Sequence, residues 1–155
     1  ALTLPVGESA PVQSQRWHRD PEEKRICKVF IYLNDIDEEA GPFTHINGSQ
    51  RGGKYGHLFP QKTPEGVYPK ESELLSKVDP KDIRLMTAPK GTVIFCDTSG
   101  LHRGGYAKTK ERLMFTAFFS APTNTEKPWY KISEEDKEIL KKELNEEQKF
   151  SLSIN

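Results

Sequence analysis

Two histidines and one aspartate stand at positions where they could bind a metal ion. His18 and Asp20 lie two residues apart in the segment Trp17-His18-Arg19-Asp20. Alternate side chains of an extended strand project from the same face, so this spacing brings an imidazole and a carboxylate to one edge. His102 follows an apolar run and precedes two glycines, and it is the candidate for a third ligand. Two histidines and one carboxylate, with neighbouring coordination positions left open, form the facial triad of non-haem Fe(II) oxygenases.

Each of these residues also has an interpretation that needs no metal. Asp20 precedes Pro21-Glu22-Glu23, a pattern typical of a helix start in which aspartate is the N-cap and proline the first helical residue. A His-x-Asp pair arises often by chance, and a histidine beside glycines is commonly a plain loop residue. Taken singly, these interpretations are favoured; the combination of the three residues favours the metal.

Arg112 begins the long apolar run RLMFTAFFS, ten residues after His102. In a strand, Arg112 shares one face with Met114, Thr116, Phe118 and Ser120. A guanidinium stays charged, so its burial requires an anionic partner. A dicarboxylate cosubstrate meets this requirement, because its distal carboxylate can accept two hydrogen bonds from Arg112 while its other end chelates the metal. The alternative is an exposed arginine at a strand end, paired with Glu111 or water.

Short apolar runs between Gly, Pro and Asp clusters predict the strands that position these residues. The run Ile26–Leu33 ends at Asn34-Asp35 and has the composition of a strand buried on both faces. The other expected strands are Phe43–Ile46, Ile83–Met86, Gly91–Cys96 and Arg112–Ser120, with Ser14–Asp20 as a further candidate. The connection Gly48–Pro69 carries five Gly and three Pro, which predicts an irregular loop that serves a site.

Two helices are also predicted, and they complete the domain organisation. One is short, Lys70–Lys77, and the other covers Ser133–Lys149, with Ser133 as its N-cap and Glu138 paired with Lys142. Strands followed by a terminal helix indicate a sandwich or barrel. We expect residues 1–125 to form this β-core and residues 126–155 to form a helical extension packed on the same domain as a lid, with a partner-binding helix as the alternative.

Composition and charge exclude several classes of function. The chain has 155 residues, which fits one domain, and its 23 Lys+Arg balance its 23 Asp+Glu. A neutral chain offers no broad basic face for nucleic acid or anionic lipid. Its apolar runs, such as Val93–Cys96, are far shorter than the ~20 residues that span a bilayer, so we expect a soluble, cytoplasmic protein. Cys27 and Cys96 lie in apolar segments, which predicts two buried free thiols.

The remaining histidines and cations have simpler interpretations. His57 is expected to be exposed in its glycine-rich loop, and His45 to pack near the interior without binding metal. Trp17 is expected in the core or in a pocket wall. Three cations could face an anionic substrate, or could cover apolar surface with their side-chain stems: Arg16, Lys28 and Arg103.

The order and spacing of these motifs resemble a known family. The segments QRWHRDPEEKRICKVFIYLNDIDEEAGPFTHINGSQRGG and KGTVIFCDTSGLHRGGYAKTKERLMFTAFFS resemble the phytanoyl-CoA dioxygenase family of Fe(II)/2-oxoglutarate oxygenases, over residues 13–120. The resemblance implies a mainly β, double-stranded β-helix fold, a cupin-like jelly roll with iron at its open mouth and a C-terminal helix. It implies that iron is held by His18, Asp20 and His102, that Arg112 anchors 2-oxoglutarate, and that Gln15 is a further candidate for contacting this cosubstrate.

The implied activity is hydroxylation of a small-molecule substrate that requires Fe(II), 2-oxoglutarate and O2 and releases succinate and CO2. Asp20 favours hydroxylation, because family-like halogenases lack this carboxylate. Two other classes stay open. A zinc-dependent hydrolase would use the same two-His-one-Asp site but leaves Arg112 unexplained. A non-catalytic jelly-roll binding module explains neither His102 nor the spacing of Arg112.

The sequence also departs from the family pattern. Asn47 and Gln50 stand where members commonly have Pro and His, and Phe43 stands where some members place a Thr near the cosubstrate. Members usually carry helices and a strand before the His-x-Asp motif, whereas 17 residues precede His18. We therefore expect either an N-terminally truncated chain or a trimmed scaffold. The identity of the substrate and the oligomeric state are not indicated by any motif.

Overall fold

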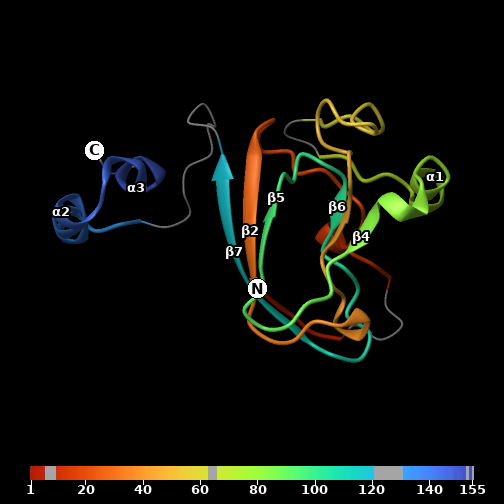
Figure 1. Ribbon diagram of the computed structural model, residues 1–155, viewed down its shortest axis with the longest axis horizontal. Helices are drawn as coiled ribbons and strands as arrows, with labels where there is room; N and C mark the ends of the chain where they lie inside the picture. The colour runs from red at the N-terminus through yellow and green to blue at the C-terminus, as the bar shows by residue number, and fades with distance from the viewer. Residues whose placement is uncertain (6–9, 63–65, 121–130, 153, 155) are drawn as a thin grey trace. The chain divides into compact units, whose positions relative to one another are not determined.

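A computed structural model of the chain describes residues 1–5, 10–62, 66–120, 131–152 and 154 (Figure 1). The chain divides into two compact units, Ala1–Asn124 and Thr125–Asn155. The first unit contains the β-sheets and the second contains two helices, α2 and α3. None of the helices in the described parts of the chain combines the length and apolar character needed to cross a membrane.

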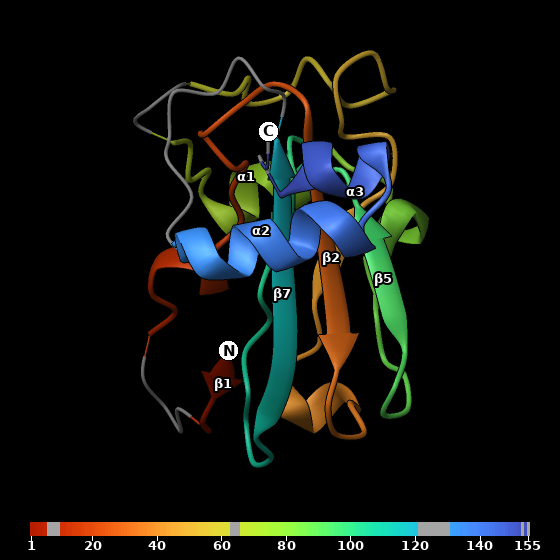
Figure 2. The same cartoon turned by 90° about the vertical axis from the view of Figure 1, so that its left-hand side faces the viewer.

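The first unit is built from two antiparallel sheets (Figure 1). The larger sheet has the order β1-β7-β2-β5, and Figure 2 shows β7, β2 and β5 side by side. Its strands are β1 (Leu2–Thr3), β2 (Ile26–Tyr32), β5 (Val93–Cys96) and β7 (Arg112–Ser120). The smaller sheet has the order β4-β3-β6, with β3 (Thr44–Ile46), β4 (Ile83–Leu85) and β6 (His102–Arg103). The predicted jelly roll, a double-stranded β-helix, is confirmed.

Short helices connect these strands. Helix α1 covers Glu71–Leu75, within the predicted Lys70–Lys77. The 3-10 helices are η1 (Gln13–Gln15), η2 (Glu38–Ala40) and η3 (Pro80–Asp82). The expected strand Ser14–Asp20 is wrong, because η1 occupies its start and its end makes only isolated bridges at His18 and Arg19. These bridges keep the local backbone extended where the candidate ligands lie.

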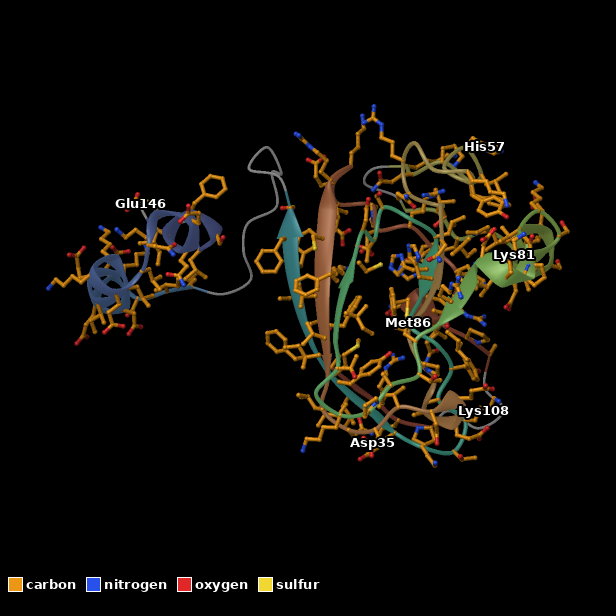
Figure 3. The ribbon with its side chains drawn as sticks, viewed as in Figure 1. Asp35, His57, Lys81, Met86, Lys108 and Glu146 are labelled. Atoms are coloured by element: carbon orange, nitrogen blue, oxygen red, sulfur yellow. The ribbon has the colours of Figure 1, made fainter. Side chains whose placement is uncertain are left out.

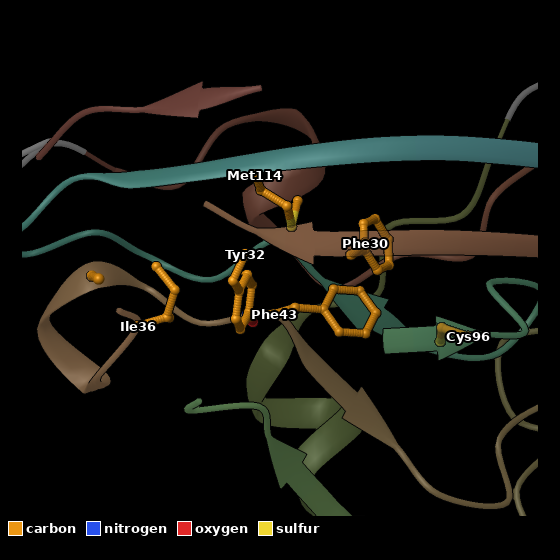
Figure 4. Close-up of a cluster of buried hydrophobic side chains, with 7 residues drawn as sticks. Phe30, Tyr32, Ile36, Phe43, Cys96 and Met114 are labelled. Atoms are coloured by element: carbon orange, nitrogen blue, oxygen red, sulfur yellow. The ribbon is translucent and has the colours of Figure 1, made fainter. Parts of the chain in front are cut away.

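The core between the two sheets comes from the alternation of β2 and β7. Phe30 and Tyr32 of β2 and Met114 of β7 project to the inner side, where they meet Phe43 next to β3 (Figure 4). The ring centroids of Phe30 and Phe43 are 4.7 Å apart. Met86 packs against this cluster from the end of β4, and Figure 3 shows it between the sheets. A second buried cluster lies under α1 and the long loop: Trp17, Ile46, Tyr55, Leu74, Val78 and Leu101.

The outer side of the larger sheet carries apolar side chains that remain exposed. Phe95 is 74% exposed and Phe115 is 51% exposed. The expectation that β2 is buried on both faces is therefore wrong, since its outward residues are exposed or half-buried. Cys27 pairs with Phe119 on this side and is exposed, so the predicted burial of both thiols holds only for Cys96. Both cysteines are free, as predicted, and burial raises the pKa of Cys96 to about 12.

Among the described residues of the second unit there are two helices, whereas one was predicted over Ser133–Lys149. Helix α2 covers Glu134–Glu143, and α3 covers Glu146–Ser151. The Ser133 hydroxyl accepts from the Asp136 N–H at 3.0 Å, as predicted for an N-cap. The helix stops because Asn145 caps α3 through a reciprocal pair of hydrogen bonds with Gln148. The packing of these helices on the β-core stays a prediction.

Candidate metal centre

Backbone pairing brings the predicted ligands together from distant parts of the sequence. The His18 N–H donates to the His102 carbonyl at 2.9 Å, and the His102 N–H donates to the His18 carbonyl at 3.0 Å. The Asp20 N–H donates to the Thr98 carbonyl at 3.1 Å. Residues directly opposite in an antiparallel bridge project to one face, and the residue two positions further along joins them. The His-x-Asp spacing therefore works as the sequence analysis predicted.

The side chains of His18, Asp20 and His102 converge. Each offers one ligand atom, and these atoms all lie within 4.8 Å of one another. The Oδ1 atom of Asp20 is 3.7 Å from Nε2 of His18 and 3.7 Å from Nε2 of His102. All three residues are buried, with at most 6% of their surface exposed. Together they form a compact cluster of two nitrogens and one oxygen.

Hydrogen bonds to the backbone fix which nitrogen of each imidazole faces the centre. Nδ1 of His18 lies 2.8 Å from the Arg16 carbonyl oxygen, and Nδ1 of His102 lies 2.9 Å from the Gly100 carbonyl oxygen. A carbonyl oxygen only accepts, so each Nδ1 carries the proton and donates it. Each Nε2 then keeps its lone pair and points at Asp20 Oδ1. This is the outer hydrogen bond that metal-binding histidines usually make.

The charges of the three groups suit a cation. Burial, followed by the neighbouring His18, lowers the pKa of His102 to about 3. Burial also lowers the pKa of His18, so both imidazoles are neutral at pH 7. Burial alone would raise the pKa of Asp20, but the adjacent Lys28 ammonium, 2.7 Å from Oδ2, helps to hold it below its ordinary value. The site therefore offers two neutral nitrogens and one carboxylate.

This donor set fits Fe(II). Imidazole and carboxylate are ligands of intermediate and hard character, and three of them on one side leave other positions open for further ligands. The same donors can also hold a catalytic zinc ion with a bound water. Phe43 lies beside the site, with its ring centroid 5.6 Å from that of His102, so a phenyl ring occupies the place where some family members carry a threonine.

Arg112 is buried at the start of β7, as the cosubstrate interpretation requires. Only 5% of its surface is exposed, and burial lowers the pKa of its guanidinium. Its Nη1 donates to the carbonyls of Gly41 and Gly104, and its Nη2 donates to Thr3 Oγ1 at 3.3 Å. The Nε–H is buried without a hydrogen-bond partner among the described residues. The guanidinium therefore keeps a buried donor whose hydrogen bond an anion would satisfy.

Gln15, the further cosubstrate candidate, follows Ser14, which is linked to Arg112 through Gly104. The Gly104 N–H donates to the carbonyl of Ser14 at 2.7 Å, and Gly104 itself accepts from Arg112. The side-chain oxygen of Gln15 accepts from the Val12 N–H at 3.0 Å. That oxygen has a local structural role, and the contact of Gln15 with a cosubstrate stays a prediction.

The long loop borders the site, as expected from its glycines and prolines. Arg19 lies between two of the candidate ligands and is 3% exposed. Its guanidinium donates to carbonyls of the loop and of the segment before His102: Ser49, Tyr55, Leu58, Phe59 and Ser99. Tyr68, near the end of the loop, stacks on His18 with ring centroids 5.7 Å apart. Neither residue was among the predicted site residues, because neither an isolated arginine nor a tyrosine carries a spacing signal.

Two of the three cations considered for an anionic substrate have carboxylate partners within the protein, and the third lies over an aromatic ring. Arg103 Nη1 lies 2.7 Å from Glu71 Oε1. Lys28 Nζ lies 2.7 Å from Oδ2 of Asp20. Arg16 lies over the ring of Tyr68, with Cζ 5.1 Å from its centroid. The other histidines agree with prediction, since His57 is exposed on its loop (Figure 3) and His45 is partly buried.

Comparison with known proteins identifies the family. The model of a family described as phytanoyl-CoA dioxygenase (PhyH) matches residues 8–114, which make up more than half of the chain. The matched segment contains the three candidate ligands and Arg112. The chain belongs to the phytanoyl-CoA dioxygenase family. The resemblance of the two sequence segments to this family is thereby confirmed.

Two solved structures are reported as similar to this chain, both at low sequence identity. AviO1 from Streptomyces viridochromogenes Tue57 is 18% identical, with a TM-score of 0.50, and the match covers 82% of this chain and 50% of AviO1. EctD from S. alaskensis with bound Fe is 18% identical, with a TM-score of 0.47, and the match covers 73% of this chain and 43% of EctD. The chain thus spans about half the length of AviO1. A search of curated proteins gives no match.

Proposed function

We propose that this chain is the core of an Fe(II)- and 2-oxoglutarate-dependent dioxygenase that hydroxylates a small-molecule substrate and releases succinate and CO2. The observation that carries the proposal is the convergence of two imidazole Nε2 atoms on Asp20 Oδ1. Membership of the phytanoyl-CoA dioxygenase family supports it. The substrate is proposed only at the level of a small molecule.

Different residues of the chain would have different roles in such a reaction. His18, Asp20 and His102 would hold the iron, and the carbonyls of Arg16 and Gly100 keep both imidazoles oriented for it. Bound iron supplies the activation of O2 and the removal of hydrogen from a C–H bond of the substrate. The low exposure of the three ligands limits access of bulk water to the centre.

Arg112 would bind the distal carboxylate of 2-oxoglutarate. Its Nη1 hydrogens go to the Gly41 and Gly104 carbonyls, which hold the guanidinium plane in place. The Nε–H has no partner among the described residues, and one Nη2–H remains beyond the bond to Thr3. A carboxylate can accept from the Nε and Nη2 positions together, which is the paired geometry that arginine favours.

A zinc-dependent hydrolase would use the same three ligands but gives no reason for a buried guanidinium with an unused edge. A jelly-roll binding module gives no reason for three convergent metal ligands. One experiment separates the three classes. The chain is purified anaerobically, loaded with Fe(II), and assayed for succinate formed from 2-oxoglutarate in air, with a panel of small molecules as substrates.

We expect succinate formation that requires Fe(II), 2-oxoglutarate and O2, that rises when a substrate is present, and that disappears in Asp20→Ala. His57→Ala is the control, because His57 is exposed on the long loop, and it should behave as wild type. A protein that binds Fe(II) at the site and yet forms no succinate with any member of the panel contradicts the proposal. Hydrolytic activity restored by zinc would favour the hydrolase instead.

A further inference from the structure

Lys28 occupies an unusual position for a lysine. It lies in the middle of β2, where it pairs with Cys96 of β5 and Phe118 of β7. Alternation along β2 places it on the same side as Phe30 and Tyr32, which belong to the core. Only 20% of the Lys28 side chain is exposed. Lysine is rarely buried without a partner, so the partner of its ammonium group is informative.

That partner is the carboxylate of the metal centre. Nζ of Lys28 lies 2.7 Å from Oδ2 of Asp20, while the other oxygen, Oδ1, faces the Nε2 atoms of both histidines. Nζ also lies 5.7 Å from the centroid of the Phe118 ring. The two oxygens of Asp20 are therefore assigned to different neighbours, one to the centre and the other to Lys28.

This division affects how a metal ion is coordinated. A carboxylate with a free second oxygen can bind a metal through both oxygens and fill an extra coordination position. With Oδ2 paired to an ammonium group, Asp20 presents Oδ1 to the centre. Lys28 also balances the single negative charge of Asp20. The positive charge of a divalent ion bound by Asp20 and two neutral imidazoles is then not compensated by the protein, and it attracts an anionic ligand. The ligand that best suits such a centre is a chelating dianion.

We propose that Lys28 is a positioning residue of the metal centre: it holds Oδ2 of Asp20, so that Asp20 binds the metal through Oδ1 alone and an adjacent position stays open for an anionic chelating ligand. This inference rests on the proposed function, because it takes the three residues as metal ligands and 2-oxoglutarate as the dianion. The inference gives Lys28 a role in binding the cosubstrate, although Lys28 lies far from Arg112 in the sequence.

The test uses Co(II), which is stable in air and reports its coordination through its visible absorption. Co(II) and then 2-oxoglutarate are titrated into wild type, Lys28→Met and Lys28→Arg. In Lys28→Met we expect Co(II) affinity within about threefold of wild type, because the lost orientation is offset by the removal of a nearby positive charge. We expect the Co(II) spectrum to change and the affinity for 2-oxoglutarate to fall about tenfold or more. Lys28→Arg should restore both.

Lys77→Met is the matched control. Lys77 also makes an ion pair, at 2.8 Å to Glu73, and also lies over a ring, 4.9 Å from the centroid of Phe59. It touches no candidate ligand, so its loss should change neither titration. Melting temperatures of all variants show whether each is folded. A merely structural role for Lys28 would weaken Co(II) and 2-oxoglutarate binding together, and Lys28→Arg would not restore the spectrum.

The outcomes separate this inference from the proposed function. A Lys28→Met protein with the wild-type spectrum and wild-type affinity for 2-oxoglutarate overturns the role of Lys28 and leaves the proposed function in place. A parallel loss of Co(II) binding in Lys28→Met also overturns it. If wild type binds Co(II) but not 2-oxoglutarate, the proposed function fails, and the spectrum of Lys28→Met still decides whether Lys28 orients Asp20. If wild type binds no Co(II), both proposals fail.

Discussion

Replacing Arg112 with lysine separates the charge of the proposed cosubstrate anchor from its shape. Lysine keeps the positive charge but presents a single ammonium group in place of a planar fork. In the structure, Nη1 of Arg112 is committed to the carbonyls of Gly41 and Gly104, and the Nε–H has no partner among the described residues. A lysine side chain at this position cannot serve both carbonyls and a pair of carboxylate oxygens.

The size of the effect follows from the hydrogen bonds that are lost. A carboxylate paired with the free edge of Arg112 would accept two charge-assisted hydrogen bonds, each worth about 1.5–3 kcal/mol. Lysine can retain one of them. The loss of the other weakens binding of 2-oxoglutarate by the same amount, and since about 1.4 kcal/mol corresponds to a tenfold change, the Kd should rise roughly 10- to 150-fold.

The assay is a titration of 2-oxoglutarate into the metal-loaded wild type and Arg112→Lys proteins. Metal affinity itself should be unchanged, because Arg112 is not a ligand. Arg84→Lys is the matched control, since Arg84 lies exposed on β4. If Arg112→Lys binds 2-oxoglutarate as tightly as wild type, the guanidinium does not make the paired contact and the assignment of Arg112 is refuted.

Three further predictions concern stability and reactivity. Replacing Arg19 with Met should lower the free energy of unfolding by about 3 kcal/mol or more, because several buried carbonyls lose their donor; a loss below about 1 kcal/mol in urea unfolding would contradict this. The EDTA-treated protein should lose stability as the pH falls from 6.5 toward 3, because the depressed pKa of His102 (about 3 against 6.5) lets the unfolded chain bind a proton first. This group alone contributes on the order of 1 kcal/mol at pH 5.5, and His18 and His45 act in the same direction; a free energy of unfolding unchanged between pH 7.5 and 5.5 would be inconsistent with neutral buried imidazoles. A thiol reagent should modify Cys27 in the native protein and reach Cys96 only after unfolding; equal native rates would argue against the burial of Cys96.

The sequence predicted the β-core well because its signals are local. The apolar run of β7 and the turn residues after β2 each define a strand within a few residues, and the observed bounds of β7, Arg112–Ser120, match the prediction. The three candidate ligands were found because the i, i+2 spacing of His18 and Asp20 holds even in an isolated bridge. The backbone pairing of His18 with His102 then brings the third ligand, which is distant in the sequence, to the same place.

Other features depend on contacts that no local pattern encodes. The break between α2 and α3 depends on competition between helix continuation and the Asn145 cap, which a hydrophobic stripe does not reveal. Lys28 looks in the sequence like one more surface cation, and only the register of β2 against β5 and β7 brings it inward to Asp20. The exposure of Cys27 follows from the alternation of side chains along β2. A continuous apolar run does not indicate which of its residues face outward.

The proposed function depends most directly on three side chains binding one iron ion. Anaerobic equilibrium titration of Fe(II) tests this in wild type, in Asp20→Ala and His102→Ala, and in His57→Ala as the exposed-histidine control. We expect one Fe(II) per chain in wild type and in His57→Ala, and a large loss of affinity in the other two variants. Fe(II) affinity unchanged by the loss of Asp20 or His102 would contradict the metal centre and the function built on it.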